Sequence, residues 1–549
     1  MTDAPQSLED PISGADEVIR EIGEDYDHQV YTSNAFPFSS PGHLRAAAHL
    51  YGLGSVPLAR ARVLELGCAG GGNLLPFALA YPEAQVVGVD LSPVQIEQGQ
   101  QIVQRLELKN LQLQTMSLTD ITPEFGQFDY IISHGVFSWV PPEVRQAMLR
   151  IVHENLSPNG LAYISYNTYP GWKAGDIVRD AMLLHSHGVQ SDDNRLASAK
   201  AVLRLLSDGI AAGNPLAPSM RAAVAQLEKH SNYYIAHEYL ERFNNPCYLL
   251  EFVDQAQQHG LTHVGDAEAH LELAATYGQN VQLNHSLIAL GKPREMRQQY
   301  LDFAVGRNFR KSLIVHQARA DEVLNGPDTA RLADLRWAAC YGKTEPDTPL
   351  PAPTQLFVDP RGRRIQSRDP LVIQILATLK AAWPRSLTIA DLAQQAGSTP
   401  GEAAPANAIL KALQTLFQLN ALHYTLEPSP YDSLPQNTGK NLAPRLVPGL
   451  AELLAATTRN ASSSVAPASL WHTPINVRLK AAERFLLPLI DGTTSRRDLA
   501  SKLTKAWHDG QVEGSDGQSL KGQRNLDARA DKVVHQTLEL LQRVGARLC

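Results

Sequence analysis

The sequence predicts an α/β fold: a seven-stranded, Rossmann-like sheet with helical insertions, followed by C-terminal α+β units of winged-helix type. Residues 63–73 read V-L-E-L-G-C-A-G-G-G-N, an apolar run that breaks into glycines. A second apolar run ends on Asp90, about 25 residues after Glu65. Similar helical patterns begin at residues 388 and 495. The first two runs indicate a strand, a glycine turn, a helix and a second strand that ends in a carboxylate. This order is typical of a unit that binds a nucleoside at the carboxyl ends of parallel strands.

The first five strands follow from their apolar runs. We expect the glycine turn to open a helix at 73–81, and Ser92, Pro93 and Gln95 to form a capping box with proline at the first helical position. Pro142 should open a later helix. The expected strands are 63–66, 86–89, 111–116, 130–133 and 161–166.

Such a sheet needs two further strands, which we assign to 261–264 and 312–315. The intervening helical stretches, about 171–245 and 266–305, then become insertions that cap the carboxyl edge of the sheet. An independent helical module is the alternative for these stretches.

The rest of the chain divides by composition and repetition. Residues 1–55 hold an acidic tail and an aromatic-rich arm, which is either a flap or a packed segment, and 56–320 form the nucleoside-binding domain. The proline-rich stretch 343–370 predicts a linker. T-I-A-D-L-A at 388 and S-R-R-D-L-A at 495 each cap a helix, and we expect winged-helix-like domains at 371–426 and 448–549.

Composition limits the classes of function. The chain has 549 residues, 44% hydrophobic and 19% charged, with a net charge of −7, which argues against coating nucleic acid. Four scattered cysteines show no metal-binding spacing and suit a reducing compartment. Neither a secretory signal nor an apolar stretch long enough for a bilayer is visible. We therefore expect a cytoplasmic protein without metal or membrane insertion.

The acids at the strand tips indicate the cofactor. Glu65 before the turn would repel a pyrophosphate but suits an ammonium and a sulfonium, and Asp90 can accept both ribose hydroxyls. This pattern favours S-adenosyl-L-methionine over a dinucleotide, whereas a glycine turn without a ligand would leave both acids unexplained. Ser117 stands where many such folds place an acid for the adenine, and Asp120 is expected to cap a helix. The expected cofactor residues are Glu65, Gly67, Cys68, Asp90, Leu91, Gln95, Ser117, Leu118 and His134.

The reacting groups should lie near the ends of the fourth and fifth strands. Methyl transfer requires an aligned, unprotonated nucleophile and the exclusion of water. His134 is either a base or a backbone contact for the methionine amino group. Aromatic faces would attract a lysine-like side chain, although packing of the insertions explains any single ring equally well. The expected residues are His134, Phe137, Trp139, Tyr166, Asn167 and Tyr169, with Trp172 alongside.

Several segments together carry a resemblance to a known family. They are Y-D-x-x-x-Y-x-S-N-A-F near Tyr26, V-L-E-L-G-C at 63, F-D-Y-I-I-S-H-G-V-F-S-W-V-P at 128, S-Y-N-T-Y-P-G-W at 165 and R-N-F-R-K-S-L at 307. The chain resembles bacterial class I methyltransferases with a regulatory domain, including the rickettsial protein lysine methyltransferases that modify outer-membrane proteins.

The resemblance implies a protein methyltransferase that acts on lysine in surface proteins and forms a homodimer. It assigns the cofactor roles to Glu65, Gly67, Asp90 and His134. A small-molecule methyltransferase and a non-catalytic protein-binding module stay open as alternatives.

Overall fold

The computed structural model describes residues 32–189, 191–241, 243–395, 405–434, 443–459, 465–514, 517–523 and 525–548. The acidic tail and the tyrosines of the motif near Tyr26 lie outside these residues.

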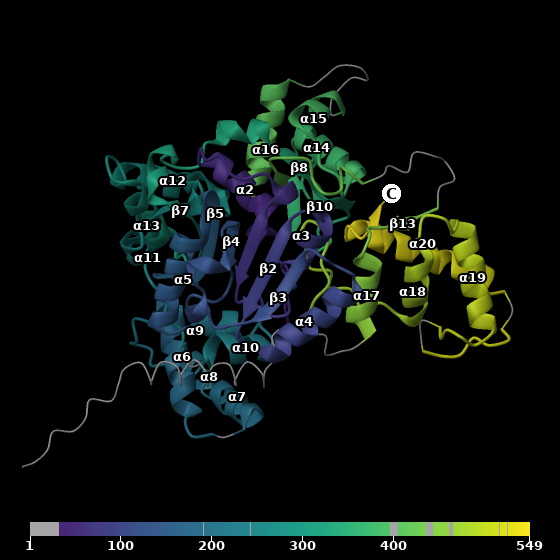
Figure 1. The fold of residues 1–549 in the computed structure, drawn as a ribbon, viewed down its shortest axis with the longest axis horizontal. Helices are drawn as coiled ribbons and strands as arrows, with labels where there is room; N and C mark the ends of the chain where they lie inside the picture. Colours follow the sequence, from purple (N-terminus) through teal and green to yellow (C-terminus); the bar gives the residue numbers. More distant parts are fainter. Residues whose placement is uncertain are drawn as a thin grey trace, which may run out of the picture.

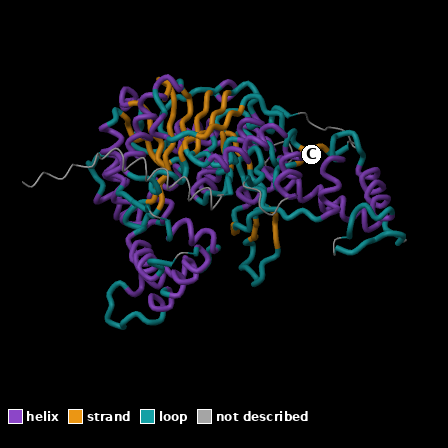
Figure 2. The backbone as a smooth tube through the Cα atoms, turned by 60° about the horizontal axis from the view of Figure 1, so that its bottom comes forward, coloured by secondary structure: helices purple, strands orange, loops and turns teal. Residues whose placement is uncertain are grey.

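A seven-stranded sheet in the order β3-β2-β1-β4-β5-β7-β6 occupies the centre of the molecule (Figures 1 and 2). β7 runs antiparallel to β5 and β6, whereas the pairings among β1 to β5 are parallel. All seven expected strands are confirmed. They are β1 (Arg62–Leu66), β2 (Gln85–Asp90), β3 (Leu111–Thr115), β4 (Phe128–Ser133), β5 (Leu156–Asn167), β6 (Leu261–Asp266) and β7 (Phe309–His316).

Each face of the sheet has its own apolar core, because successive side chains along a strand point to opposite faces. Val63, Tyr130 and Tyr163 belong to one core, whereas Leu64 and Ile131 belong to the other. The covering helices include α2 (Pro41–Leu50), α3 (Leu75–Ala80), α4 (Pro93–Arg105), α5 (Pro142–Asn155) and α11 (Leu249–Gln258).

At the start of α4, only one of the two hydrogen bonds of the expected capping box is present in the described residues. The Ser92 hydroxyl accepts a hydrogen bond from the Gln95 backbone N–H at 3.2 Å, with Pro93 at the first helical position. The Gln95 side-chain oxygen has no hydrogen-bond partner among the described residues, so the reciprocal half is absent. Gln95 turns toward a cavity at the sheet edge instead.

The first insertion, between β5 and β6, has a small core of its own that includes Val178, Leu203, Val224 and Ile235. In Figure 2 its helices extend away from the sheet at the lower left. In the chain it is inserted between two strands of the sheet, as we expected. It also has its own core, as the alternative of a separate helical module implied. Its helices are α6 (Lys173–His185), α7 (Asp192–Ala201), α8 (Leu203–Ser207), α9 (Ala217–Leu227) and α10 (Asn232–Tyr239).

A buried ionic cluster ties the second insertion, α12 (Gln279–Ile288) and α13 (Arg294–Val305), to β7. Both oxygens of Asp302 accept from Arg310 at 2.8 Å, and one also accepts from Arg307 at 2.9 Å. Arg310 also contacts Glu272 at 3.2 Å. The side chains of Asp302, Arg310 and Glu272 are at most 1% exposed. The R-N-F-R motif therefore has a structural role.

The stretch 343–370 is not the unstructured linker that its prolines predict. It holds an antiparallel sheet of β9 (Gly342–Thr344), β10 (Gln355–Val358) and β11 (Arg364–Ser367). Phe357 and Ile365 are buried and belong to a large core cluster. These apolar side chains pack the small sheet against the core of the protein. The proline content of the stretch gave no indication of this packing.

Two helical units follow, and both expected helix caps are present. Asp391 N–H donates to Thr388 Oγ1 at 3.1 Å, and Asp498 N–H donates to Ser495 Oγ at 3.1 Å. The first unit comprises α14 (Pro370–Ala382), α15 (Ile389–Gln395), α16 (Ala406–Gln418) and β12 (His423–Thr425), which pairs with β8 (Arg336–Ala338). The second comprises β13 (Arg445–Leu446), α17 (Leu450–Arg459), α18 (Ala481–Leu486), α19 (Arg496–His508), α20 (Asp527–Arg543) and β14 (Arg547–Leu548).

Within the described ranges, no helix combines the length and apolar character that a bilayer crossing requires. The same residues contain no cluster of three histidine, cysteine or acidic side chains arranged to hold a metal ion.

Candidate active site

A cavity of about 390 Å³ opens at the carboxyl ends of β1, β2 and β4. Every residue expected to bind a cofactor lines this cavity. These residues are Glu65, Gly67, Cys68, Asp90, Leu91, Gln95, Ser117, Leu118 and His134.

The glycine turn leaves no space for side chains. Gly67 has φ +75°, and a Cβ there would lie 2.4 Å from Val136 Cγ2. A Cβ on Gly72 would lie 2.3 Å from the carbonyl oxygen of Ser33. Glycine is therefore needed at both positions, for backbone conformation at one and close approach at the other.

The N-terminal arm, residues 32–38, lies against this turn. The Ser33 hydroxyl accepts from Gly72 N–H at 2.8 Å and donates to Cys68 O at 3.2 Å. Ser33 also pairs with Val465 of the C-terminal unit, and Ala466 N–H donates to Ser33 O at 2.9 Å. The arm is thus held between the turn and the C-terminal unit.

Glu65 is 3% exposed and lies at the end of β1. Its Oε1 accepts from the Asn73 amide at 2.8 Å, but its buried Oε2 has no hydrogen-bond partner among the described residues. Burial raises the pKa of Glu65 to about 8. A buried acceptor without a donor is costly, so a cationic donor bound in the cavity would satisfy it.

Asp90 ends β2, and its carboxylate is oriented by the backbone. Oδ2 accepts from Ala69 N–H at 2.7 Å, and Oδ1 accepts from Ser92 N–H at 3.0 Å. Gln95 supplies a second buried oxygen at the cavity. This part of the wall is therefore a set of acceptors suited to hydroxyl donors.

The far wall is apolar. Leu118 begins a short 3-10 helix, Leu118–Asp120, whose first N–H groups are capped by Ser117 rather than by Asp120 as expected. Met116 and Val140 lie beside it in the cavity lining. Apolar side chains of this kind suit the faces of a planar base.

His134 is positioned at the end of β4 by its neighbours. Its Nδ1 lies 3.0 Å from both the Tyr163 and the Ser165 hydroxyl oxygens. The Phe36 ring lies 4.1 Å from the imidazole, centroid to centroid. Burial lowers the pKa of His134 to about 3, so the imidazole is neutral at physiological pH.

The expected channel of aromatic side chains does not form, and only Trp139 of that set lines the cavity. Phe137 and Tyr166 are buried in the core, where their rings pack against Phe252 at 5.4 and 4.3 Å. β5 continues to Asn167, so Tyr166 points to the face that α11 covers.

The remaining members of the expected set lie away from the cavity. The Asn167 amide donates to Asn244 at 3.0 Å. Tyr169 packs against Tyr248 and donates to Asp176 at 2.7 Å, while Trp172 packs against Tyr239. These groups attach the first insertion to the sheet.

The structure also brings residues to the cavity that sequence reasoning missed. The dense aromatics of the arm indicated a flap, but not that Phe36 would reach the cofactor side. Glu238 of α10 had no sequence signal, because its place depends on how the insertion packs. The missed residues include Ser33, Asn34, Phe36, Asn73 and Glu238.

Three family models match parts of the chain. Residues 63–160 match a methyltransferase domain, 231–316 a predicted methyltransferase regulatory domain, and 446–545 the PKMT C-terminal winged helix domain.

Individual relatives extend these matches. An uncharacterised protein of Rickettsia prowazekii is 38% identical over 294 residues, which cover 53% of this chain and 52% of that protein. A second is 37% identical over 234 residues, 42% of this chain and 94% of that protein. The solved structure of PKMT2 from Rickettsia typhi is 25% identical, has a TM-score of 0.77, and covers 94% of this chain and 100% of that one. Its complex with AdoHcy gives a TM-score of 0.75 over the same shares.

Proposed function

This chain belongs to the class I, S-adenosyl-L-methionine-dependent methyltransferases that carry a methyltransferase regulatory domain and a PKMT-type C-terminal winged helix, and we propose that it methylates lysine side chains of a protein. The alignment with one rickettsial relative spans only about half the length of that protein. The identity of the methyl acceptor is therefore our own proposal and is not taken from that relative.

The unsatisfied Oε2 of Glu65 carries the assignment of the methionine end of the cofactor. An ammonium group bound there would supply the missing donor and stabilise the ionised carboxylate. Asp90 would accept from the ribose hydroxyls, because its backbone contacts already fix its orientation. Leu91 and Leu118 would enclose the adenine, and Gln95 and Ser117 would offer polar contacts at its edge.

S-adenosyl-L-methionine supplies an electrophilic methyl group, which a lone pair on the acceptor displaces in line. The chain has to align the acceptor and exclude water. The arm covers one side of the cavity, and the Phe36 ring packs against His134 at a tilt of 49°. Neutral His134 adds no charge beside a cationic cofactor. Its lowered pKa makes it a weak base, so a polar contact in the cavity suits it better than removal of a proton from the attacking amine.

The acceptor class is supported by the extent of the likeness to PKMT2, which includes the C-terminal unit as well as the sheet. We further infer that the acceptor is an outer-membrane or other surface protein, and that the enzyme acts in the cytoplasm as a homodimer. Nucleic acid is not an expected partner, in keeping with the net charge of −7.

The test combines binding with product analysis. Calorimetry should show that the full chain binds S-adenosylhomocysteine, and labelled cofactor should mark protein in a lysate from cells that lack the gene. Acid hydrolysis of that protein should yield labelled methyl-lysine. Absence of binding would overturn the enzyme assignment, whereas label confined to the low-mass fraction would favour a small-molecule acceptor.

A further inference from the structure

A second cavity, of about 780 Å³, lies on the other side of the arm from the cofactor cavity. Ala35, Pro37 and Phe38 line this second cavity, Asn34 lines the cofactor cavity, and Phe36 lines both. Phe36 therefore lies at the boundary of both spaces. The volume lies within the range of about 300–1,000 Å³ that is usual for ligand sites.

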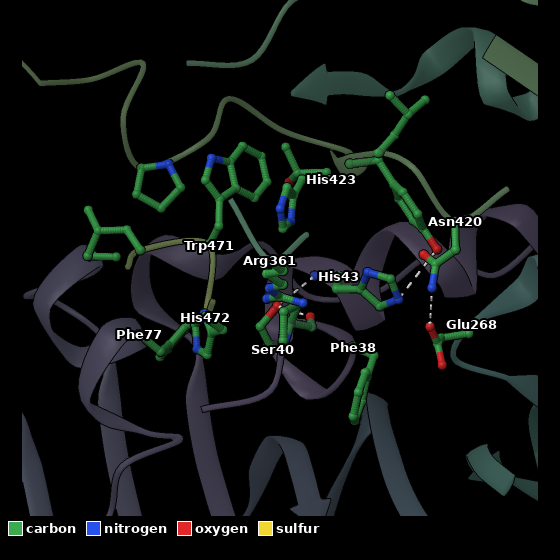
Figure 3. A pocket seen from close by; sticks show the side chains of 18 of the residues that line it. Phe38, Ser40, His43, Phe77, Glu268, Arg361, Asn420, His423, Trp471 and His472 are labelled. Carbon is green, nitrogen blue, oxygen red and sulfur yellow. Dashed lines mark hydrogen bonds between the residues drawn. The ribbon is translucent and has the colours of Figure 1, made fainter. Parts of the chain in front are cut away.

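A smaller lobe, of about 180 Å³, adjoins the second cavity and shares Phe38, Arg361, Arg363 and His423 with it. Figure 3 shows Arg361 in this lobe, between Ser40 and His43 on one side and His423 and Trp471 on the other. We call the two lobes together the basic cavity.

Arginine dominates the charge of the basic cavity. Arg361, Arg363, Arg478 and Arg543 line the larger lobe, where Asp359 is the one acid. Asp359 pairs with Arg363 at 2.7 Å. In the part of the chain that the structure describes, the other three guanidinium groups have no acidic partner within 4.0 Å. Three solvent-exposed arginines without a direct ion pair in the described residues thus face one space, in a chain whose net charge is −7.

A further polar group in the smaller lobe lacks a partner. His472 is 4% exposed, and its buried Nε2 has no hydrogen-bond partner among the described residues. Glu268, the acid of this lobe, is neutralised by Lys311 at 2.6 Å. The basic cavity therefore offers unmatched positive charge and a polar side chain ready to contact a ligand, as an anion-binding site requires.

We propose that the basic cavity receives an acidic stretch of the acceptor protein. Carboxylates of that stretch bind Arg361, Arg478 and Arg543, while the target lysine passes Phe36 to reach the cofactor cavity. This assignment rests on the proposed function, and it adds a substrate class: lysines flanked by aspartate or glutamate. A lysine side chain is long and unbranched, which suits a passage beside a single ring.

The test uses the full chain saturated with S-adenosylhomocysteine and two fluorescent peptides. Each peptide has one central lysine, flanked by aspartates in one and by asparagines in the other. The acidic peptide should bind at least about tenfold more tightly by fluorescence anisotropy. Added salt should weaken this preference.

Charge-reversal variants test whether the acidic peptide binds in the basic cavity. The double variant Arg361→Glu, Arg543→Glu should lose the preference and raise KM for the acidic peptide, with little change in kcat. Arg364→Glu is the matched control, because Arg364 begins β11 three residues after Arg361, is 62% exposed and pairs with Asp347 outside the cavity. Equal binding of both peptides by the wild-type chain, or a preference that survives the double variant, would overturn the proposal.

Two further measurements separate the causes of failure. Affinity for S-adenosylhomocysteine should be the same in all variants, and its absence in the wild-type chain would count against the proposed function itself. A short single-stranded RNA serves as the third probe. RNA binding that the double variant abolishes, without binding of the acidic peptide, would assign the cavity to nucleic acid and overturn the proposal.

Discussion

Two regions of this protein bury carboxylates, and they differ in how fully those groups are paired. In the ionic cluster, Asp302 and Glu272 contact Arg307 and Arg310, and both oxygens of Asp302 accept hydrogen bonds. In the cofactor cavity, Glu65 is almost as buried, but one of its oxygens has no hydrogen-bond partner in the part of the chain that the structure describes.

The difference separates a structural site from a binding site. A buried network whose members are satisfied within the chain holds the fold together and needs no ligand. A buried polar atom without a partner costs free energy in the unbound protein. In our proposal, the donor that Glu65 lacks belongs to the cofactor.

The largest effect should come from breaking the paired cluster. Asp302→Ala removes the carboxylate that pairs with both Arg307 and Arg310, and leaves Arg310 with Glu272 as its acidic contact. The loss of this buried partner should lower the free energy of unfolding by about 3–5 kcal/mol. Chemical denaturation measures this loss. Asp347→Ala, which removes the exposed partner of Arg364, should have no measurable effect. Equal stability of the two variants would contradict a structural role for the cluster.

Removal of the second acid expected to bind the cofactor should strongly weaken binding while the fold persists. Asp90→Ala deletes the acceptor that Ala69 and Ser92 orient, and the affinity for S-adenosylhomocysteine should fall by about a hundredfold in calorimetry. Asp90→Asn keeps an acceptor oxygen, and its affinity for S-adenosylhomocysteine should fall less. Unchanged binding by Asp90→Ala would contradict the ribose assignment.

Glu65→Gln should move stability and affinity in opposite directions. Burial raises the pKa of Glu65 to about 8, so the folded chain keeps a proton that the unfolded chain releases above about pH 4.5. Stability is therefore lost as the pH rises from about 4.5 to 8. A glutamine removes this loss, and the variant should melt at a higher temperature at pH 8. It should bind S-adenosylhomocysteine about tenfold more weakly, because a neutral amide replaces the carboxylate.

The last effect concerns one proton released on binding. At pH 7 Glu65 is mostly protonated, and a bound ammonium favours its ionised form. Affinity should rise by up to about tenfold per pH unit between pH 6 and 8 and level off above that. Calorimetry in buffers with different ionisation enthalpies measures the released proton, and Glu65→Gln should remove it. Binding without proton release in the wild-type chain would contradict the buried neutral state.

That the residues expected to bind the cofactor line one cavity could be predicted, because the backbone alone fixes their place. The carboxyl ends of parallel strands meet at one edge, so Glu65, Asp90 and His134 had to lie together once β1, β2 and β4 were recognised. The aromatic residues after β4 and β5 could not be placed in this way. Whether Tyr166 faces a cavity or the core depends on α11 and on insertions whose packing has no local pattern.

The basic cavity lay beyond sequence reasoning for a related reason. Arg361 lies in a stretch whose prolines predict a linker, and Arg543 lies about 180 residues further along the chain. Only the packing of the two C-terminal units on the arm brings them to one space.

The pairing of Ser33 with Val465 means that the methyltransferase domain cannot be separated from the C-terminal unit without losing a contact of the N-terminal arm. A Cβ on Gly70 would lie 2.7 Å from Val465, so the C-terminal unit is in contact with the cofactor turn itself. A chain cut after residue 445 would lose this cover and the anchor of the arm together. The two parts of the enzyme therefore have to be engineered together.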